Sequence, residues 1–395
     1  ELTRLRDQLL QRMEQEPPTQ AALTEHLAWT LEFHRREAKP VWWRLFERKA
    51  STHDELLDDI DCLACCTLTD APTFKATPKA RNLAYTYTVE AQEFKRPRGS
   101  GGKDPKMFLF DGTDTHDATW LAEHCGLNAG NVVIQLGKTV PSFMSLLPNE
   151  YVNPKPIPES IQSVVAAYAQ GQGYPAAIMD FLQRRPPRLQ GHEGNTIIPA
   201  DTPNRLQAII AAVCRLDSSY LVLQGPPGTG KTFTGKHIIA ALVGQGKTVG
   251  ITSNSHAAIN NLLVGVASHC RKEGIEAHCC CTSETGDDIA ANGIHVIKND
   301  QIAEHIRPGC VIGTTAWGFS RDDVAGLFDY LFVDEAGQVS VANLIGVSRS
   351  CRNLVLMGDQ MQLSQSSQGS HPQDSGKSVL DYLLKDNPVV PPDMG

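Results

Sequence analysis

The sequence contains few aromatic residues and no long apolar segment. Phenylalanine, tryptophan and tyrosine make up 6% of the 395 residues. No uninterrupted apolar run reaches the roughly 20 residues that a membrane-spanning helix needs. The chain opens with a charged segment, ELTRLRDQLLQRMEQE, instead of the apolar core of a signal peptide. These absences argue against a secreted or integral membrane protein, and we expect a cytoplasmic protein with no membrane partner.

Disulfide bonds are not expected, although the chain has 11 cysteines. An odd number of cysteines in clusters does not resemble the disulfide framework of a secreted domain. One cluster contains a single C-x-x-C pair, Cys62 and Cys65, and the other is the run 279–281 in a strand-like segment. Zinc or an iron–sulfur cluster would need a second pair of ligands. We therefore predict reduced thiols in place of a metal site at these cysteines.

An excess of positive charge is also absent, because the formal net charge is −8. Such a chain has no overall attraction to nucleic acid, but a local basic groove can bind a strand within an acidic protein. The segment 94–106 is basic and glycine-rich, and it lies between two strand-like runs. We predict that Lys95, Arg96 and Arg98 contact a phosphate backbone there. A solvated charged loop is the alternative interpretation.

The pattern of apolar and turn-forming residues changes along the chain and predicts an α/β fold with accessory segments. Residues 1–60 have helical spacing interrupted at Pro17-Pro18 and Pro40, and residues 61–150 form short β-like runs separated by turns. Residues 151–194 return to helix and end in a linker, and strand-like and helix-like segments alternate over residues 195–395. The alternation predicts a doubly wound parallel sheet. The β-like runs predict a small barrel or sandwich.

The segment GPPGTGKT at residues 225–232 fits the phosphate-binding pattern G-x-x-x-x-G-K-[ST]. It follows a strand-like run at 219–224 and precedes a helix-like run at 233–243. Glycines allow backbone N–H groups and a helix N-terminus to point at phosphate oxygens. Lys231 would reach the β- and γ-phosphates, and Thr232 would ligate Mg²⁺. The predicted ATP-binding residues of this loop are Gly225, Pro226, Pro227, Gly228, Thr229, Gly230, Lys231 and Thr232.

Two acidic residues follow the apolar run 330–333 and supply what a Mg·ATP hydrolase needs. Asp334 would hold Mg²⁺, and Glu335 would accept a proton from the attacking water or orient it. Paired acids are also common as helix caps, so the prediction depends on their combination with the phosphate loop. Further along, the strand-like run 353–357 leads into GDQMQL, where Gln362 would sense the γ-phosphate.

The order of these motifs resembles the first RecA-like half of a superfamily 1B helicase, in the branch of nonsense-decay helicases and replication nucleases. The segments that carry the resemblance are GPPGTGKT, GITSNSHAAINNLL, VIGTTAW, VDEAGQ and LVLMGDQMQL. Residues 35–50, RREAKPVWWRLFERKA, resemble the helicase part of bacterial fusions that carry a RecB-like nuclease upstream. The resemblance implies that the helices and the barrel form a stalk and an accessory barrel, and that the protein moves 5′ to 3′ on single strands.

The resemblance also implies roles for individual residues. Gln207 would read the adenine edge, for which its side-chain amide offers one donor and one acceptor; an exposed helix residue is the alternative. Lys231, Glu335 and Gln362 would act in catalysis, and Thr232 and Asp334 would bind the metal. The predicted contacts to the sugar-phosphate backbone are Ser253, Asn254, Ser255, Thr314 and Thr315, whose small polar groups bind phosphates without reading base sequence. Helix-cap or turn roles are their alternative.

The same resemblance predicts partners outside this chain. Glu1 is not an initiator methionine, and Gly395 lies where a second RecA-like domain should begin. We therefore expect a monomeric part of a longer protein, with that second domain, an upstream nuclease and single-stranded nucleic acid, DNA in preference to RNA, as partners. Two other functions remain open. One is a P-loop ATPase that acts on a partner other than nucleic acid, and the other is a strand-binding module with a weak nucleotide site.

Overall fold

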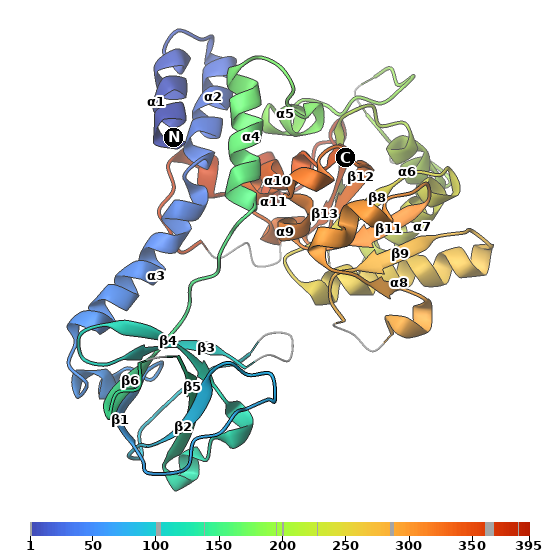
Figure 1. The fold of residues 1–395 in the computed structure, drawn as a ribbon. Helices are drawn as coiled ribbons and strands as arrows, with labels where there is room; N and C mark the ends of the chain where they lie inside the picture. Colours follow the sequence, from blue (N-terminus) through green and yellow to red (C-terminus); the bar gives the residue numbers. More distant parts are fainter. Residues whose placement is uncertain are drawn as a thin grey trace. The chain divides into compact units, whose positions relative to one another are not determined.

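A computed structural model describes residues 2–99, 104–137, 139–194, 196–199, 201–226, 228–284, 288–359, 367–385 and 387–395. The chain divides into two compact units, which are described separately (Figure 1). The first unit consists of Glu1–Glu37 and Pro154–Gly395, and the second consists of Ala38–Asn153. The boundaries proposed from the sequence, after residues 60, 150 and 194, stay a prediction.

The first unit is built on a parallel β-sheet. In the described part of the chain its strands, in spatial order, are β10 (His295–Val296), β9 (His278–Cys281), β11 (Cys310–Gly313), β8 (Val249–Thr252), β12 (Phe328–Val333), β13 (Cys351–Gly358) and β7 (Tyr220–Gln224). All neighbouring pairs are parallel. Most of these strands are continuous apolar runs, which is typical of parallel strands buried on both faces. The predicted doubly wound sheet is confirmed.

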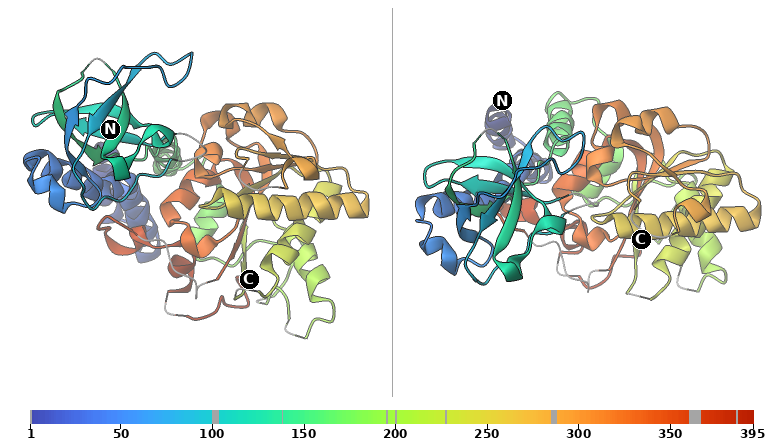
Figure 2. Two further views of the ribbon diagram at one scale, coloured as in Figure 1. Left: turned by 90° about the horizontal axis from the view of Figure 1, so that it is seen from below. Right: turned by 60° about the horizontal axis from the view of Figure 1, so that its bottom comes forward.

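Helices cover both faces of this sheet because alternate strand residues point to opposite sides. Tyr220 and Val222 of β7 belong to one buried cluster, and Leu221 belongs to another. The second cluster includes α6 (Arg205–Cys214), α7 (Lys231–Gly244) and α8 (His256–Glu273). The first includes α4 (Ile157–Ala169), α5 (Ala176–Leu182), α9 (Ala316–Phe319), α10 (Val341–Ser348) and α11 (Val379–Leu384). Figure 2 shows α8 lying along its side of the sheet.

The N-terminal helices pack on the first cluster. They are α1 (Leu2–Met13) and α2 (Pro18–Thr30), followed by the start of α3 (Phe33–Ala50). The predicted interruption at Pro17-Pro18 is confirmed, since α1 ends at Met13 and α2 begins at Pro18, where a missing N–H costs nothing. The predicted interruption at Pro40 is wrong, because α3 runs through it.

Contacts made beyond Pro40 explain why α3 continues. Proline removes one helical hydrogen bond, here the one to the Arg36 carbonyl, but its fixed φ is compatible with a helix. Past Pro40, the ring of Trp42 packs at 5.0 Å from that of Tyr151. Arg48 pairs with Asp59 at 2.7 Å. These contacts hold the second half of the helix in place.

The second unit contains a closed antiparallel barrel. Within the described residues the order around it is β1 (Leu63–Leu68), β2 (Leu83–Thr88), β5 (Asn131–Leu136), β4 (Thr115–Trp120), β3 (Lys106–Phe110) and β6 (Phe143–Pro148). Tyr87, Leu109 and Ile134 are among the side chains that fill its interior. Closure leaves no free sheet edge. Of the two architectures expected from the β-like runs, the barrel is the one formed.

Short 3-10 helices complete the described chain. They are η1 (Glu55–Asp58), η2 (Ala122–His124), η3 (Leu127–Ala129), η4 (Ala290–Asn292), η5 (Asn299–His305), η6 (Asp322–Val324), η7 (Ala336–Gln338) and η8 (Gln373–Gly376). The cysteine run forms β9 as predicted, and burial raises the pKa of Cys279 to about 12, so this thiol stays protonated. None of the helices in the described ranges is long and apolar enough to cross a membrane.

Candidate functional site

The phosphate-loop motif lies between the end of β7 and the start of α7. Gly228 and Gly230 have φ values of +79° and +85°, in the left-handed region that favours glycine. A side chain at Gly225 would place its Cβ 2.6 Å from the Thr229 hydroxyl, so this position also needs glycine. Helix α7 begins at Lys231, and the N–H groups of its first turn have no partners within the helix. The loop therefore presents backbone donors at a helix N-terminus. Pro227 lies outside the described residues.

Side chains of the motif hold the loop in this shape. The Lys231 ammonium donates to the Gly225 carbonyl and to the Pro226 carbonyl, the latter at 3.0 Å. The Thr229 hydroxyl donates to the same Pro226 carbonyl at 2.7 Å. Thr232 is partly buried at the second position of α7. Lys231 is thus directed back over the loop, where phosphate oxygens can replace the carbonyls as acceptors.

The two acids lie at the carboxyl end of β12. The Asp334 backbone N–H donates to the Thr252 carbonyl at 2.9 Å, and the Glu335 N–H donates to the Asp334 carboxylate at 2.9 Å. Burial raises the pKa of Asp334, and the Glu335 charge adds to this effect. The Glu335 N–H and the charge of Lys231 act in the opposite direction. Asp334 is therefore within the electrostatic reach of the phosphate-loop lysine.

Glu335 adopts an unusual backbone conformation, with φ at +53° and ψ at 43°. A residue with a side chain pays about 1–3 kcal/mol for such a conformation. Its carboxylate accepts a hydrogen bond from the Ser253 hydroxyl at 3.2 Å. The turn thus aims this side chain toward the end of β8 and holds it there. No local sequence pattern indicates the Ser253 contact, since the two residues are far apart in the chain.

Strand β13 closes the arrangement beside the acids and the loop. The Gly225 N–H donates to the Gly358 carbonyl at 3.1 Å. A Cβ at Gly358 would lie 3.1 Å from the Ala336 nitrogen, so the backbone of this strand end packs against the turn after the acids. Asp359 follows and is buried, at 4% exposure. The carboxyl ends of β7, β8, β12 and β13 thus meet at one edge of the sheet, which is where open α/β sheets bind ligands.

Several residues predicted to contact the nucleic-acid backbone already have roles within the protein. The Ser255 hydroxyl caps α8 by accepting from the Ala258 N–H at 3.1 Å. The Asn254 amide donates to the Gln338 carbonyl. Thr314 is fully buried, and its hydroxyl lies 2.9 Å from the Asn299 side chain. Thr315 is half-buried at the start of α9. The Thr314 backbone N–H donates to the Ile251 carbonyl at 3.1 Å, so this buried residue offers no free donor to a ligand in this conformation.

The remaining predicted residues are dispersed. Gln207 is exposed on α6, where its backbone N–H donates to the Asn204 side chain at 3.3 Å. In the second unit Lys95, Arg96 and Arg98 are exposed, and Lys95 pairs with Asp61 at 3.3 Å. Gln362 falls within residues 360–366, outside the described part of the chain.

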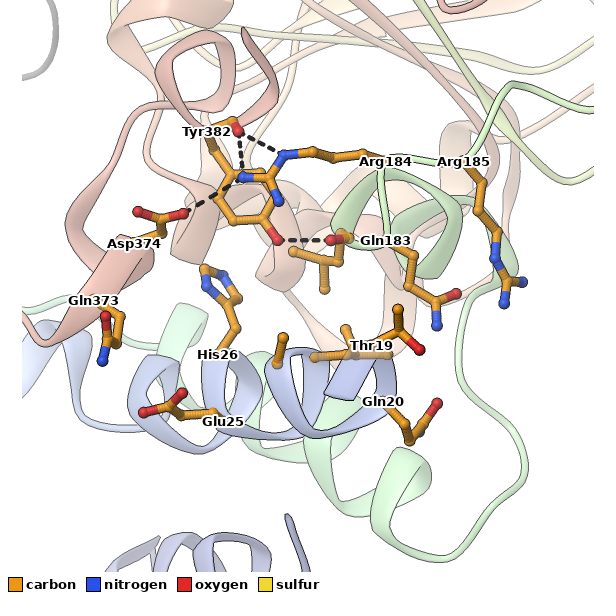
Figure 3. Close-up of a pocket in the computed structure, with 13 residues that line it drawn as sticks. Thr19, Gln20, Glu25, His26, Gln183, Arg184, Arg185, Gln373, Asp374 and Tyr382 are labelled. Carbon is orange, nitrogen blue, oxygen red and sulfur yellow. Dashed lines mark hydrogen bonds and ion pairs between the residues drawn. The ribbon is translucent and has the colours of Figure 1, made fainter. Parts of the chain in front are cut away.

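A separate cavity of about 590 Å³ lies in the first unit, away from the phosphate loop. It separates α2 from the end of α5 and from the segment before α11 (Figure 3). Arg184 stacks on the Tyr382 ring at 4.0 Å and pairs with Asp374 at 3.4 Å. His26 borders the cavity, and burial lowers its pKa to about 4, which keeps the imidazole neutral. The interactions drawn there join Arg184 to Asp374 and to the Tyr382 carbonyl, and the Tyr382 hydroxyl to the Leu182 carbonyl.

Comparisons with known proteins agree with the geometry of the sheet edge. Residues 204–375, from α6 to η8, match the AAA domain family. The chain is similar to the DNA replication ATP-dependent helicase/nuclease DNA2 of Saccharomyces cerevisiae, with 29% identity over 196 residues, 46% of this chain and 12% of that protein. It is also similar to human DNA2, with 28% identity over 192 residues, 43% of this chain and 17% of that protein. The chain thus spans less than a fifth of these relatives.

Solved structures give a weaker likeness. An arterivirus nonstructural protein 10 (helicase) in complex with DNA is 13% identical, with a TM-score of 0.33, over 74% of this chain and 54% of that chain. Because the score is low, the fold assignment depends on the strand order described above. The match to the AAA domain family covers the phosphate loop and every strand of the parallel sheet described above. Together with the similarity to ATP-dependent helicase/nucleases, this match confirms the resemblance to the RecA-like half of a superfamily 1B helicase.

Proposed function

We propose that this protein binds Mg·ATP at residues 225–232 and couples its hydrolysis to movement along single-stranded nucleic acid. The main support for the proposal is that the phosphate loop, Asp334, Glu335 and the end of β13 lie together at one edge of a parallel sheet. The glycine conformations and the start of α7 support a phosphate site. Similarity to ATP-dependent helicase/nucleases supports the coupling to a nucleic acid.

The donor set at this edge fits a magnesium nucleotide. Thr232 and Asp334 offer a hydroxyl and a carboxylate oxygen, which are the ligand types that Mg²⁺ prefers. When bound, the ion offsets the charge of the phosphates. Lys231 would exchange its contacts with loop carbonyls for phosphate oxygens. Glu335 would accept a proton from the attacking water, and Ser253 would hold its carboxylate in place.

Two glutamines complete the proposed nucleotide site. The exposed position of Gln207 on α6 leaves its amide available to an adenine edge. Gln362 would respond to the γ-phosphate. Full turnover would need a second RecA-like domain that supplies arginine side chains, because loss of such an arginine costs about 10³- to 10⁵-fold in rate.

A single strand would bind mainly through its phosphates. Ser253, Asn254, Ser255, Thr314 and Thr315 follow β8 and β11, and they would contact the phosphates once the nucleic acid replaces some of their contacts within the protein. Lys95, Arg96 and Arg98 would add charge contacts from the barrel unit. We propose DNA as the strand, with movement from 5′ to 3′, a monomeric state and a cytoplasmic location. A nuclease domain in the same longer protein would match the relatives that are named helicase/nuclease.

ATP hydrolysis with and without single-stranded DNA or RNA tests the proposal. The protein should be assayed as the longer chain that includes the second RecA-like domain, at one fixed salt concentration. We expect one polymer to raise turnover about tenfold, which is well below the 10³- to 10⁵-fold that completion of a phosphoryl-transfer site can give. Turnover that neither polymer changes would favour an ATPase acting on another partner. Strand binding without turnover would favour a binding module.

A Glu335→Gln variant separates binding of ATP from its hydrolysis. The amide keeps the size of the side chain but cannot accept the proton, so we expect turnover to fall by about 10²- to 10⁴-fold while Mg·ATP affinity changes little. The measurement is hydrolysis in a single turnover together with equilibrium binding. Glu276→Gln, at an exposed glutamate far along the chain from both motifs, is the control. Undiminished turnover would remove Glu335 from the mechanism.

A further inference from the structure

A carboxylate on α3 collects several hydrogen bonds from one short segment beyond β13. Glu37 Oε1 accepts from the Ser367 hydroxyl at 2.6 Å and from the Gly369 N–H at 3.1 Å. The Gln368 N–H donates to the other oxygen, Oε2, at 3.1 Å. His371 Nε2 lies 2.6 Å from Oε1. We call Ser367–His371 the docked segment. Two of its four contacts to Glu37 come from backbone N–H groups and two from side chains.

The carboxylate is charged and largely shielded from water. Side-chain exposure is 19% for Glu37 and 3% for His371. Burial by itself would raise the pKa of Glu37, but the bonds from His371, Ser367 and the two backbone N–H groups lower it. Hydrogen bonds to a charged acceptor are about twice as strong as neutral ones. The contact is therefore strong and selective for a carboxylate.

Steric fit reinforces the same contact. A Cβ at Gly369 would lie 2.6 Å from the Arg36 carbonyl oxygen and 3.0 Å from the Glu37 nitrogen, so the segment rests directly on the helix backbone. This carbonyl is the one that lacks its helical partner because Pro40 has no N–H. The His371 ring also stacks on Phe33, with 4.6 Å between centroids and 20° between planes. The Phe33 ring, the Arg36 carbonyl and the Glu37 carboxylate, all on α3, thus contact the docked segment.

The chain on either side of the docked segment is anchored as well. Before it, Gly358 at the end of β13 accepts from the phosphate-loop Gly225 N–H. After it, Asp374 pairs with Arg184, whose guanidinium also donates to the Tyr382 carbonyl (Figure 3). Gln373, between these contacts, has a φ of +50°. The end of β13, the docked segment and Asp374 are therefore each held by contacts of their own.

We propose that Glu37 is a positioning residue for ATP hydrolysis, acting by docking Ser367–His371 on α3, a segment that begins eight residues after Asp359 at the nucleotide edge of the sheet. This proposal rests on the proposed function, since it assigns the role of β13 to ATP chemistry. Glu37 itself does not touch the phosphate loop. Its loss should alter the rate of the chemical step rather than the capture of ATP, because the phosphate loop and Lys231 lie elsewhere on the sheet edge.

Amide hydrogen exchange tests the docking independently of activity. In the full chain, Glu37→Gln should speed exchange at Gln368 and Gly369 by about tenfold or more, since each N–H loses a charged acceptor. Glu47→Gln, at an exposed position of the same helix, is the matched control and should leave both amides unchanged. Unchanged exchange in Glu37→Gln would overturn the docking. If that variant unfolds, Gly369→Ala tests the same contact from the other side.

Steady-state kinetics with a single strand tests the positioning. Glu37→Gln should lower kcat about tenfold, because small misplacement within a site is costly, and should leave KM for ATP within about twofold. A merely structural role would lower the amount of active protein, which active-site titration corrects, and would then leave kcat unchanged; that result would overturn the proposal. These rates are measured in the longer chain that includes the second RecA-like domain. Absence of turnover in the unaltered form of that chain would instead overturn the proposed function, and the exchange result would still decide the docking.

Discussion

Glu335 and Lys231 are each held by neighbours that lie elsewhere in the sequence or across a turn. Glu335 is kept at φ +53° while its N–H bonds to Asp334 and its carboxylate bonds to Ser253. Lys231 is kept over the loop by the Gly225 and Pro226 carbonyls. Conformational strain of about 1–3 kcal/mol persists only where surrounding contacts compensate it. The side chains of the candidate site are therefore preorganised.

Replacement of Lys231 tests the phosphate-loop assignment. Lys231→Ala removes charged donors to phosphate, each worth about 1.5–3 kcal/mol, so affinity for Mg·ATP should fall by about 100-fold. Equilibrium titration with a fluorescent ATP analogue measures the effect. Lys236→Ala, one turn along the same helix, is the control and should bind normally. Normal affinity in Lys231→Ala would contradict the assignment.

His26 predicts a loss of stability in mild acid. Burial lowers its pKa from 6.5 to about 4, so the unfolded chain binds a proton between these values that the folded chain does not. Stability is then complete above pH 6.5 and is lost as pH falls toward 4. His34 acts in the same direction, because burial lowers its pKa to about 4 as well.

Thermal unfolding between pH 7 and pH 5 measures this effect. The melting temperature should fall across the interval, and His26→Gln should reduce that fall because glutamine does not titrate. His295→Gln, at an exposed position of β10, should leave the fall unchanged. An identical pH dependence in His26→Gln and the unaltered protein would exclude this histidine as a cause.

Helix termini link local sequence to the site. Ser255, Ser340 and Ser378 each cap a helix, α8, α10 and α11 respectively, through a hydroxyl that accepts a backbone N–H. A residue that the sequence predicts to contact nucleic acid can therefore also be required for folding. The opposite error occurred at Pro40, where local propensity predicted an end to the helix. There the contacts of Trp42 and Arg48 outweighed the lost hydrogen bond.

Ser255→Ala measures the capping role at the start of α8. Loss of an N-cap costs about 1 kcal/mol, so the urea midpoint of the first unit should fall accordingly. Ser163→Ala, in the middle of α4, should be close to neutral, because its hydroxyl only bonds the Glu159 carbonyl within the same helix. A stability unchanged by Ser255→Ala, accompanied by weaker strand binding, would instead assign this hydroxyl to the nucleic acid.

The two compact units have separate cores. The barrel encloses its own cluster around Tyr87, Leu109 and Ile134, while the sheet of the first unit is sandwiched between two other clusters. A closed barrel also has no unpaired edge strands within its described residues. The barrel unit therefore does not need the first unit to complete its hydrogen bonding.

Residues 38–153 should accordingly fold as an isolated fragment. We expect a β-rich circular dichroism spectrum and a single cooperative unfolding transition, since the barrel is closed and has its own core. A Leu109→Ala variant of the fragment, at a fully buried position, should be destabilised by about 2–5 kcal/mol and serves as a test of specific packing. An unfolded fragment, or one insensitive to this substitution, would show that the barrel depends on the rest of the chain.

Short motifs were sufficient to predict the phosphate loop, the paired acids and the alternation of strands and helices. Each of these is encoded over a few adjacent residues, because glycine conformations, strand ends and helix starts are local properties. The same locality explains the wrong break at Pro40. The roles of Gln207, Gln362 and the predicted strand contacts stay predictions, since each depends on a ligand or a partner domain.

Contacts between distant segments could be obtained only from the folded chain. Ser253 reaches Glu335 because β8 and β12 are neighbours in the sheet, and Glu37 reaches Ser367 and Gly369 because the docked segment packs on α3. No local pattern encodes such pairs. They form because the packing of buried strands and helices determines which segments become neighbours. The energy of that packing is the sum of many weak contacts over the whole unit.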